Sequence, residues 1–117
     1  MNLLAKLESI KPYIGNTPLY ALEHDKINLY AKLEYCNFSG SVKDRAAYNI
    51  LHNAISNQFV NEHTTIVESS SGNLAIALAT ICKKLGLRFK PVVDPNINPA
   101  YVEVLNHLVE EFVMVDQ

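Results

Sequence analysis

The stretch Ser39-Gly40-Ser41-Val42-Lys43-Asp44-Arg45 marks the point where a loop becomes a helix. Small residues precede Lys43, and the apolar residues after it recur at the spacing of one helix face: Ala46, Ala47, Ile50, Leu51, Ala54 and Ile55. Lys43 should therefore lie beside the positive end of a helix dipole, which favours the neutral amine that attacks carbonyls. Taken alone, however, this pattern fits a solvated surface lysine better.

Working outward from this stretch, strands and helices alternate along the chain. Residue patterns predict strands at 28–34, 64–68, 89–93 and 112–115, and helices at 3–10, 43–57, 74–85 and 99–109. Pro91 is awkward inside a central strand and suggests an edge or a bulge. This order is typical of right-handed βαβ crossovers. We therefore expect a three-layer α/β fold, with a mostly parallel four-stranded sheet and helices on both faces.

Size and composition exclude several classes of protein. The 117 residues suggest one α/β domain, and the net charge of −2 does not favour nucleic acid or an anionic membrane surface. No apolar run approaches the ~20 residues that cross a bilayer. Cys36 and Cys82 are far apart, which favours reduced thiols in the cytoplasm. The four histidines have no paired spacing that would predict a metal site.

A second polar segment, Ser70-Ser71-Gly72-Asn73, opens the apolar helix at 74–85. Backbone N–H groups, two hydroxyls and a glycine at a helix start can bind an anion such as a carboxylate. Ordinary N-capping of the helix is the alternative, and from the residues alone it is favoured. In open sheets, ligands bind beyond the carboxyl ends of the strands. Because this segment and Lys43 both follow a strand and precede a helix, they can face the same crevice.

Three motifs in this order resemble the cysteine synthase family of pyridoxal-phosphate (PLP) enzymes, which have fold type II, the tryptophan synthase β-like fold. They are Gly15-Asn16-Thr17-Pro18-Leu19, Ser41-Val42-Lys43-Asp44-Arg45 and Glu68-Ser69-Ser70-Ser71-Gly72-Asn73. The resemblance runs from about Gly15 to the end of the chain. It implies a cytoplasmic enzyme of amino acid biosynthesis that binds small amino acid substrates and is a homodimer at full length.

The resemblance also implies roles for individual residues. Lys43 would form the imine with PLP, and Asn73 would bond the 3′-oxygen of the cofactor. The substrate carboxylate would be held by the loop that follows the predicted strand at 64–68. Its residues are Ser70, Ser71, Gly72, Asn73 and Leu74. The segment 15–18 would lie near the mouth of the active site, although it is equally well described as a plain turn. Asp44 and Arg45 are expected to fix the helix start rather than to take part in chemistry.

The chain departs from the usual cysteine synthase pattern in ways that bear on the substrate. Leu74 and Ala75 stand where the family loop usually has threonine and glycine, and Val92-Val93-Asp94-Pro95 is also unusual. A similar leucine and Val-Asp-Pro stretch occur in the branch that makes 2,3-diaminopropionate precursors of siderophores from O-phosphoserine and an amine such as glutamate. We therefore expect β-replacement on an O-activated serine, O-phosphoserine or O-acetylserine, by an amine. Cysteine synthesis from sulfide is the alternative.

One expected part of such an enzyme is missing from the sequence. The family holds the PLP phosphate on a glycine- and threonine-rich loop in a later part of a longer chain. The four glycines here are scattered at positions 15, 40, 72 and 86, so no phosphate cradle is visible. Residues 1–117 are therefore either the N-terminal part of a longer enzyme or a truncated relative, which could be a non-catalytic binding module.

Overall fold

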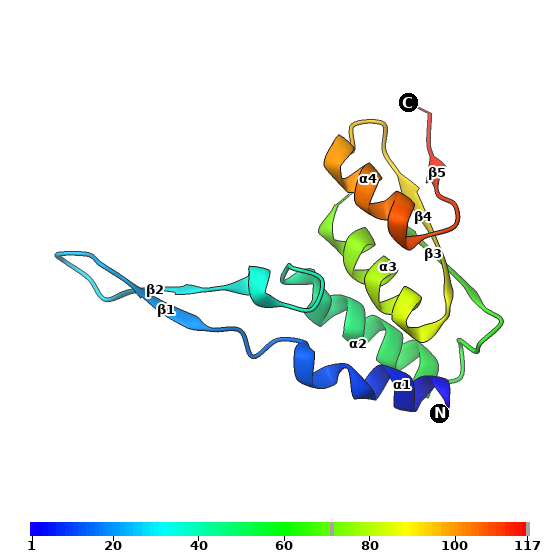
Figure 1. The fold of residues 1–117 in the computed structure, drawn as a ribbon, viewed down its shortest axis with the longest axis horizontal. Coiled ribbons are helices and arrows are strands. Elements are labelled where there is room, and N and C mark those ends of the chain that lie inside the picture. The colour runs from blue at the N-terminus through cyan, green and yellow to red at the C-terminus, as the bar shows by residue number, and fades with distance from the viewer. Residues whose placement is uncertain (71, 117) are drawn as a thin grey trace.

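The computed structural model describes residues 1–70 and 72–116 and consists of helices packed on a small sheet, with a hairpin that extends away from them (Figure 1). Two short 3₁₀ helices lie at Lys11–Tyr13 and Glu34–Cys36. The other elements, in chain order, are α1 (Leu3–Ser9), β1 (Leu19–Leu22), β2 (Leu29–Lys32), α2 (Lys43–Ser56), β3 (Thr65–Ser69), α3 (Asn73–Leu85), β4 (Arg88–Val93), α4 (Pro99–Leu108) and β5 (Val113–Met114).

The four predicted helices are all confirmed, with ends that the sequence explains. α2 begins at Lys43, at the predicted change from loop to helix. α3 ends at Gly86, whose φ of +75° is the left-handed conformation that glycine adopts without strain. α4 starts after Asn98, whose side chain accepts a hydrogen bond from Ala100 N at 2.9 Å, and Pro99 occupies the first helical position.

The prediction of one four-stranded sheet is wrong. The parallel sheet has three strands in the order β3-β4-β5, while β2 pairs in antiparallel register with β1 in a separate hairpin. The residues of β1, Leu-Tyr-Ala-Leu, include no β-branched side chain, so this strand was not predicted. β2 and β3 lie in different sheets, so the segment through α2 that joins them is not a crossover within one sheet.

The expected three layers, with helices on both faces, are also not found in the described part of the chain. α3 packs against β4, and α1, α2 and α4 all contact α3 rather than the opposite face. The buried side of β4 carries Phe89, Pro91 and Val93, which alternate with the more exposed Arg88, Lys90 and Val92. On the open face of β3, Val67 is 57% exposed. Apart from the hairpin, the described residues therefore form two layers, one of helices and one of strands.

Pro91 lies in the central strand of the sheet rather than at an edge. The carbonyl of Val92 accepts from Ser70 N on the β3 side, and that of Val93 accepts from Val115 N on the β5 side. Residues alternate in direction along a strand, so Pro91 faces the β5 side, as Val93 does. The pairing of β5 begins only opposite Val92, and the N–H that proline lacks is therefore not needed there.

The core lies between α2, α3 and the buried face of the sheet. Its fully buried members include Leu51 of α2, Leu78 and Ile81 of α3 and Leu105 of α4. Among the described helices, none is long and apolar enough to cross a membrane. The packed helices hold the starts of α2 and α3 in fixed positions, and these starts carry the predicted site.

Candidate functional site

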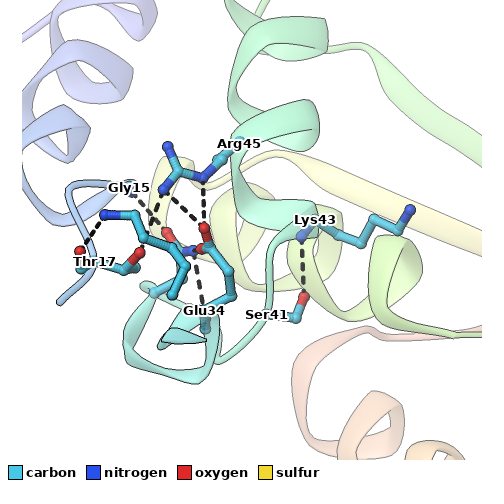
Figure 2. A network of polar contacts seen from close by, with 8 residues as sticks. Gly15, Thr17, Glu34, Ser41, Lys43 and Arg45 are labelled. Carbon is cyan, nitrogen blue, oxygen red and sulfur yellow. Dashed lines mark hydrogen bonds and ion pairs between the residues drawn. The ribbon is translucent and has the colours of Figure 1, made fainter. Parts of the chain in front are cut away.

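Lys43 is the first residue of α2 and its side chain is exposed. Its backbone N–H donates to Ser41 Oγ at 3.2 Å, so the serine hydroxyl binds one of the free amides of the helix start. Figure 2 shows the lysine side chain extending away from the polar contacts that surround Arg45. The amine is thus available to a ligand rather than used in holding the fold.

Asp44, directly after Lys43, is fully buried. Its carboxylate accepts a hydrogen bond from Ser39 N at 2.5 Å and another from the Ser39 hydroxyl. A carboxylate in the first turn of a helix is also stabilised by the helix dipole. As expected from the sequence, Asp44 fixes the loop that leads into α2.

Arg45 joins the helix start to the base of the hairpin. Its Nε and Nη2 donate to Glu34 Oε1 at 3.2 and 2.9 Å, and Nη2 also lies 3.4 Å from Thr17 Oγ1 (Figure 2). The pKa of the Glu34 carboxyl lies below its ordinary value, and the main cause is hydrogen bonding from Arg45. Arg45 therefore has a structural role, as the sequence predicted.

The turn at residues 15–18 is tied to the same network. Gly15 N donates to Asn37 Oδ1 at 2.6 Å, and Asn37 Nδ2 donates in turn to Glu34 Oε2. Gly15 and Asn16 have φ of +72° and +48°, which makes the segment a tight turn. Sequence reasoning missed Glu34 and Asn37. No motif marks either residue, and only the burial of Asn37 between turn and helix distinguishes it.

The loop before α3 carries the second predicted set of residues. Ser70 Oγ accepts from Ala75 N at 3.2 Å, so this hydroxyl supports the start of α3, as the capping alternative predicted. Gly72 has φ −144°, and no atom lies within 4 Å of the position that a Cβ would take. Asn73 is exposed and Leu74 packs partly against the core. Ser71 lies outside the described residues.

Open space at Gly72 is informative because packing does not require glycine there. At Gly15, in contrast, a Cβ would lie 2.7 Å from Arg45 Nη1. Because Gly72 has no side chain, the backbone of the α3 start is accessible to a ligand.

The starts of α2, α3 and α4 lie on one side of the molecule, and the three helices run in the same direction (Figure 1). Lys43 and the segment Gly72–Asn73 therefore occupy the same edge, at the carboxyl end of β3. This is where open α/β sheets bind ligands. An exposed amine and a helix start with accessible amides can together bind a molecule that has a carbonyl and a carboxylate.

Comparisons with known proteins show the family to which the chain belongs. Residues 10–117 match the family described as "Pyridoxal-phosphate dependent enzyme". Over 101 residues the chain is 48% identical to N-(2-amino-2-carboxyethyl)-L-glutamate synthase of Cupriavidus metallidurans, a match that covers 83% of this chain and 30% of that protein. Over 91 residues it is 44% identical to cysteine synthase B of Campylobacter jejuni, which covers 78% of this chain and 30% of that protein.

Solved structures give the same result. A hydrogen sulfide-producing enzyme of Fusobacterium nucleatum superposes with a TM-score of 0.84 at 27% identity, over 98% of this chain and 37% of that enzyme. The chain thus spans about a third of the length of the proteins that it matches. The fold is the α/β fold of type II PLP enzymes, and the chain belongs to the family of pyridoxal-phosphate dependent enzymes.

Proposed function

We propose that residues 1–117 are the lysine-bearing N-terminal part of a PLP-dependent enzyme that replaces the β-substituent of an O-activated serine. The observation that carries this proposal is the exposed Lys43 amine at the start of α2, on the same edge as the open backbone of Gly72–Asn73. The names of the two curated relatives support a reaction on a serine-derived amino acid. O-phosphoserine or O-acetylserine would be the substrate.

The residues present fit one side of the cofactor. Lys43 would attach PLP covalently, because its amine is exposed and the loop before it is held in place. Asn73 would bind the 3′-oxygen. The PLP phosphate needs a set of backbone N–H groups, and the scattered glycines of this chain do not supply one. That part of the site would belong to a longer protein.

The chain's residues would then do two things during the reaction. The loop of Ser70, Ser71, Gly72, Asn73 and Leu74 would bind the substrate carboxylate through backbone N–H groups at the start of α3. Once the substrate amine has displaced Lys43 from PLP, the freed Nζ at the neighbouring helix start would take the proton from the substrate α-carbon as a general base. PLP, when bound, supplies the electron sink that makes this proton acidic.

For the nucleophile, we propose an amine rather than sulfide. Leu74 and Val93-Asp94-Pro95 depart from the usual cysteine synthase sequence, and the relative at 48% identity is a synthase of N-(2-amino-2-carboxyethyl)-L-glutamate. Sulfide remains the second candidate because cysteine synthase B is 44% identical. The test is product analysis of the whole gene product with O-phosphoserine or O-acetylserine and either glutamate or sulfide. The glutamate adduct is expected, whereas cysteine as the main product would contradict an amine nucleophile.

The alternative from another class is a truncated relative that binds a partner or an amino acid without catalysis. We expect the 117 residues on their own to bind PLP weakly. Several charge-assisted hydrogen bonds to the phosphate would be absent, each worth roughly 1.5–3 kcal/mol. Borohydride reduction of the isolated chain with PLP should label several lysines. Stoichiometric labelling at Lys43 alone with micromolar PLP would show instead that the short chain is a complete cofactor domain.

Two wider expectations belong to the same proposal. The full-length enzyme would be a homodimer, which light scattering of the whole gene product can test. It would work in the cytoplasm, as the resemblance to cysteine synthases implies.

A further inference from the structure

We propose that Asp44 is a positioning residue for Lys43, which it directs through the loop 39–42. This inference rests on the proposed function, because it assumes that Lys43 attaches the cofactor. It goes beyond that function by assigning a role to a buried carboxylate next to the reactive amine.

The contacts of Asp44 are all made on the loop side of Lys43. The carboxylate is fully buried and accepts from both the N–H and the hydroxyl of Ser39. Between these two residues, Ser41 Oγ accepts from Lys43 N, and Ser41 O accepts from Asp44 N at 3.3 Å. These hydrogen bonds therefore close the segment from Ser39 to Asp44, which includes the backbone of Lys43, into one ring.

The geometry of the helix turns this ring into a directional constraint. Successive helix residues are rotated by about 100°, so Lys43 and Arg45 point about 200° apart. Figure 2 shows this directly, because the Arg45 network lies on one side of α2 and the Lys43 side chain extends to the other. With Arg45 bonded to Glu34 and Asp44 bonded to Ser39, the first turn of α2 is held at two points. These contacts fix the direction of the Lys43 Cα–Cβ bond and leave its side chain exposed.

A buried carboxylate is costly unless it is well paired, and here its partners are a loop amide and a hydroxyl rather than a cation. Asparagine at this position keeps the size of the side chain but loses the charge, so its hydrogen bonds to Ser39 become weaker neutral ones, and its Nδ2 has to donate to the hydroxyl. Alanine at position 39 removes only the hydroxyl donor. Asp44→Asn and Ser39→Ala should therefore both loosen the loop, and the two effects should not add, because both weaken the same contact.

The experiment uses the whole gene product and two measurements. The first is the rate at which Lys43 becomes attached to PLP, followed by absorbance and checked by borohydride reduction and peptide mapping. The second is amide hydrogen exchange of residues 39–42 without PLP. Ile55→Val is the matched control, because Ile55 lies on the buried face of the same helix, three turns from the loop. The variants are compared at equal folded fraction.

Asp44→Asn is expected to slow attachment by roughly tenfold or more and to speed exchange at residues 39–42, while Ile55→Val changes neither. An unchanged attachment rate in Asp44→Asn would overturn the positioning role, since a merely structural aspartate affects only stability. Unchanged exchange at residues 39–42 would also overturn it, whatever the cofactor does. A wild-type protein in which PLP attaches to a different lysine would contradict the proposed function instead, and the exchange measurement would still decide the role of the Asp44–Ser39 contact.

Discussion

Arg45 donates two hydrogen bonds to the same oxygen of Glu34, from Nε at 3.2 Å and from Nη2 at 2.9 Å. The pair links the first turn of α2 to the base of the hairpin, and through Asn37 it reaches the turn at Gly15. Charge-assisted contacts of this kind fix orientation as well as adding stability. Segments that are far apart in the sequence thus meet at the first turn of α2, on the side that carries Arg45.

The Glu34–Arg45 pair predicts how stability depends on pH. Because Arg45 lowers the pKa of the Glu34 carboxyl in the folded protein, the pair stabilises the fold above the ordinary glutamate range. This stabilisation should be lost as the pH falls through that range, near pH 4, and below it. Glu34→Gln should therefore be less stable than wild type at pH 7, and the difference should shrink in acid. Urea unfolding at several pH values measures it.

The matched control is Glu110→Gln, which removes an exposed pair with Arg88 at 3.9 Å. Such pairs contribute little, so this variant should differ little from wild type at any pH. A Glu34→Gln variant whose stability relative to wild type does not change between pH 7 and pH 3 would contradict the role assigned to Arg45.

Substitution by alanine should affect stability very differently at two of the glycines. Gly15→Ala places a residue with φ of +72° in the left-handed region and a Cβ 2.7 Å from Arg45 Nη1. We expect a loss of about 1–2 kcal/mol of unfolding free energy from the backbone alone, with further loss as Arg45 moves. Gly72→Ala meets no atom within 4 Å and should change stability by no more than about 0.5 kcal/mol.

The same Gly72→Ala variant should lose turnover in the whole gene product, because the added methyl occupies the space proposed for the substrate carboxylate. Thermal unfolding and product formation are measured on the same samples. If Gly72→Ala keeps wild-type turnover, the loop before α3 does not bind substrate through its backbone.

The amide side chain of Asn73 gives a separate test of the cofactor contact. Asn73→Ala should still attach PLP through Lys43 but should slow the reaction. One lost hydrogen bond to a charged group is worth roughly 1.5–3 kcal/mol, which corresponds to about ten- to a hundredfold in rate. Single-turnover kinetics with saturating PLP measure the effect, and wild-type rates in the variant would remove Asn73 from the site.

The two cysteines should differ sharply in reactivity. Burial within α3 raises the pKa of the Cys82 thiol to about 12, whereas Cys36 is exposed. Only a thiolate reacts with iodoacetamide, so at pH 8 the native protein should be alkylated at Cys36 alone. In Cys36→Ser, label should appear at Cys82 only after unfolding in urea. Rapid alkylation of Cys82 in the native Cys36→Ser protein would show that α3 is not packed as described.

Local patterns predicted most elements of this fold, and long-range contacts account for what they missed. The spacing of apolar residues after Lys43 gave the start of α2, and Asn98-Pro99 gave the start of α4. The four-stranded sheet was wrong because β1 has no β-branched side chain and its pairing with β2 depends on a contact that periodicity cannot reveal. The sheet topology depends on contacts between distant segments, whereas the positions of the helices follow from local sequence.

The candidate site shows the same division. Lys43 and the segment Gly72–Asn73 could be proposed from the sequence because each lies at a local change from loop to helix and within a motif that resembles the cysteine synthase family. Asn37 and Glu34 could not, because their importance comes from partners many residues away, at Gly15 and Arg45. A buried asparagine in a loop has no sequence pattern of its own.

The most direct test of the central claim is to find which lysine holds the cofactor. The whole gene product is saturated with PLP, reduced with borohydride, digested and analysed by mass spectrometry, beside a Lys43→Ala variant. We predict one modified peptide, containing Lys43, and no stoichiometric modification in the variant. A modified Lys32, Lys83 or any other lysine in the wild-type protein, with Lys43 unmodified, would contradict the account.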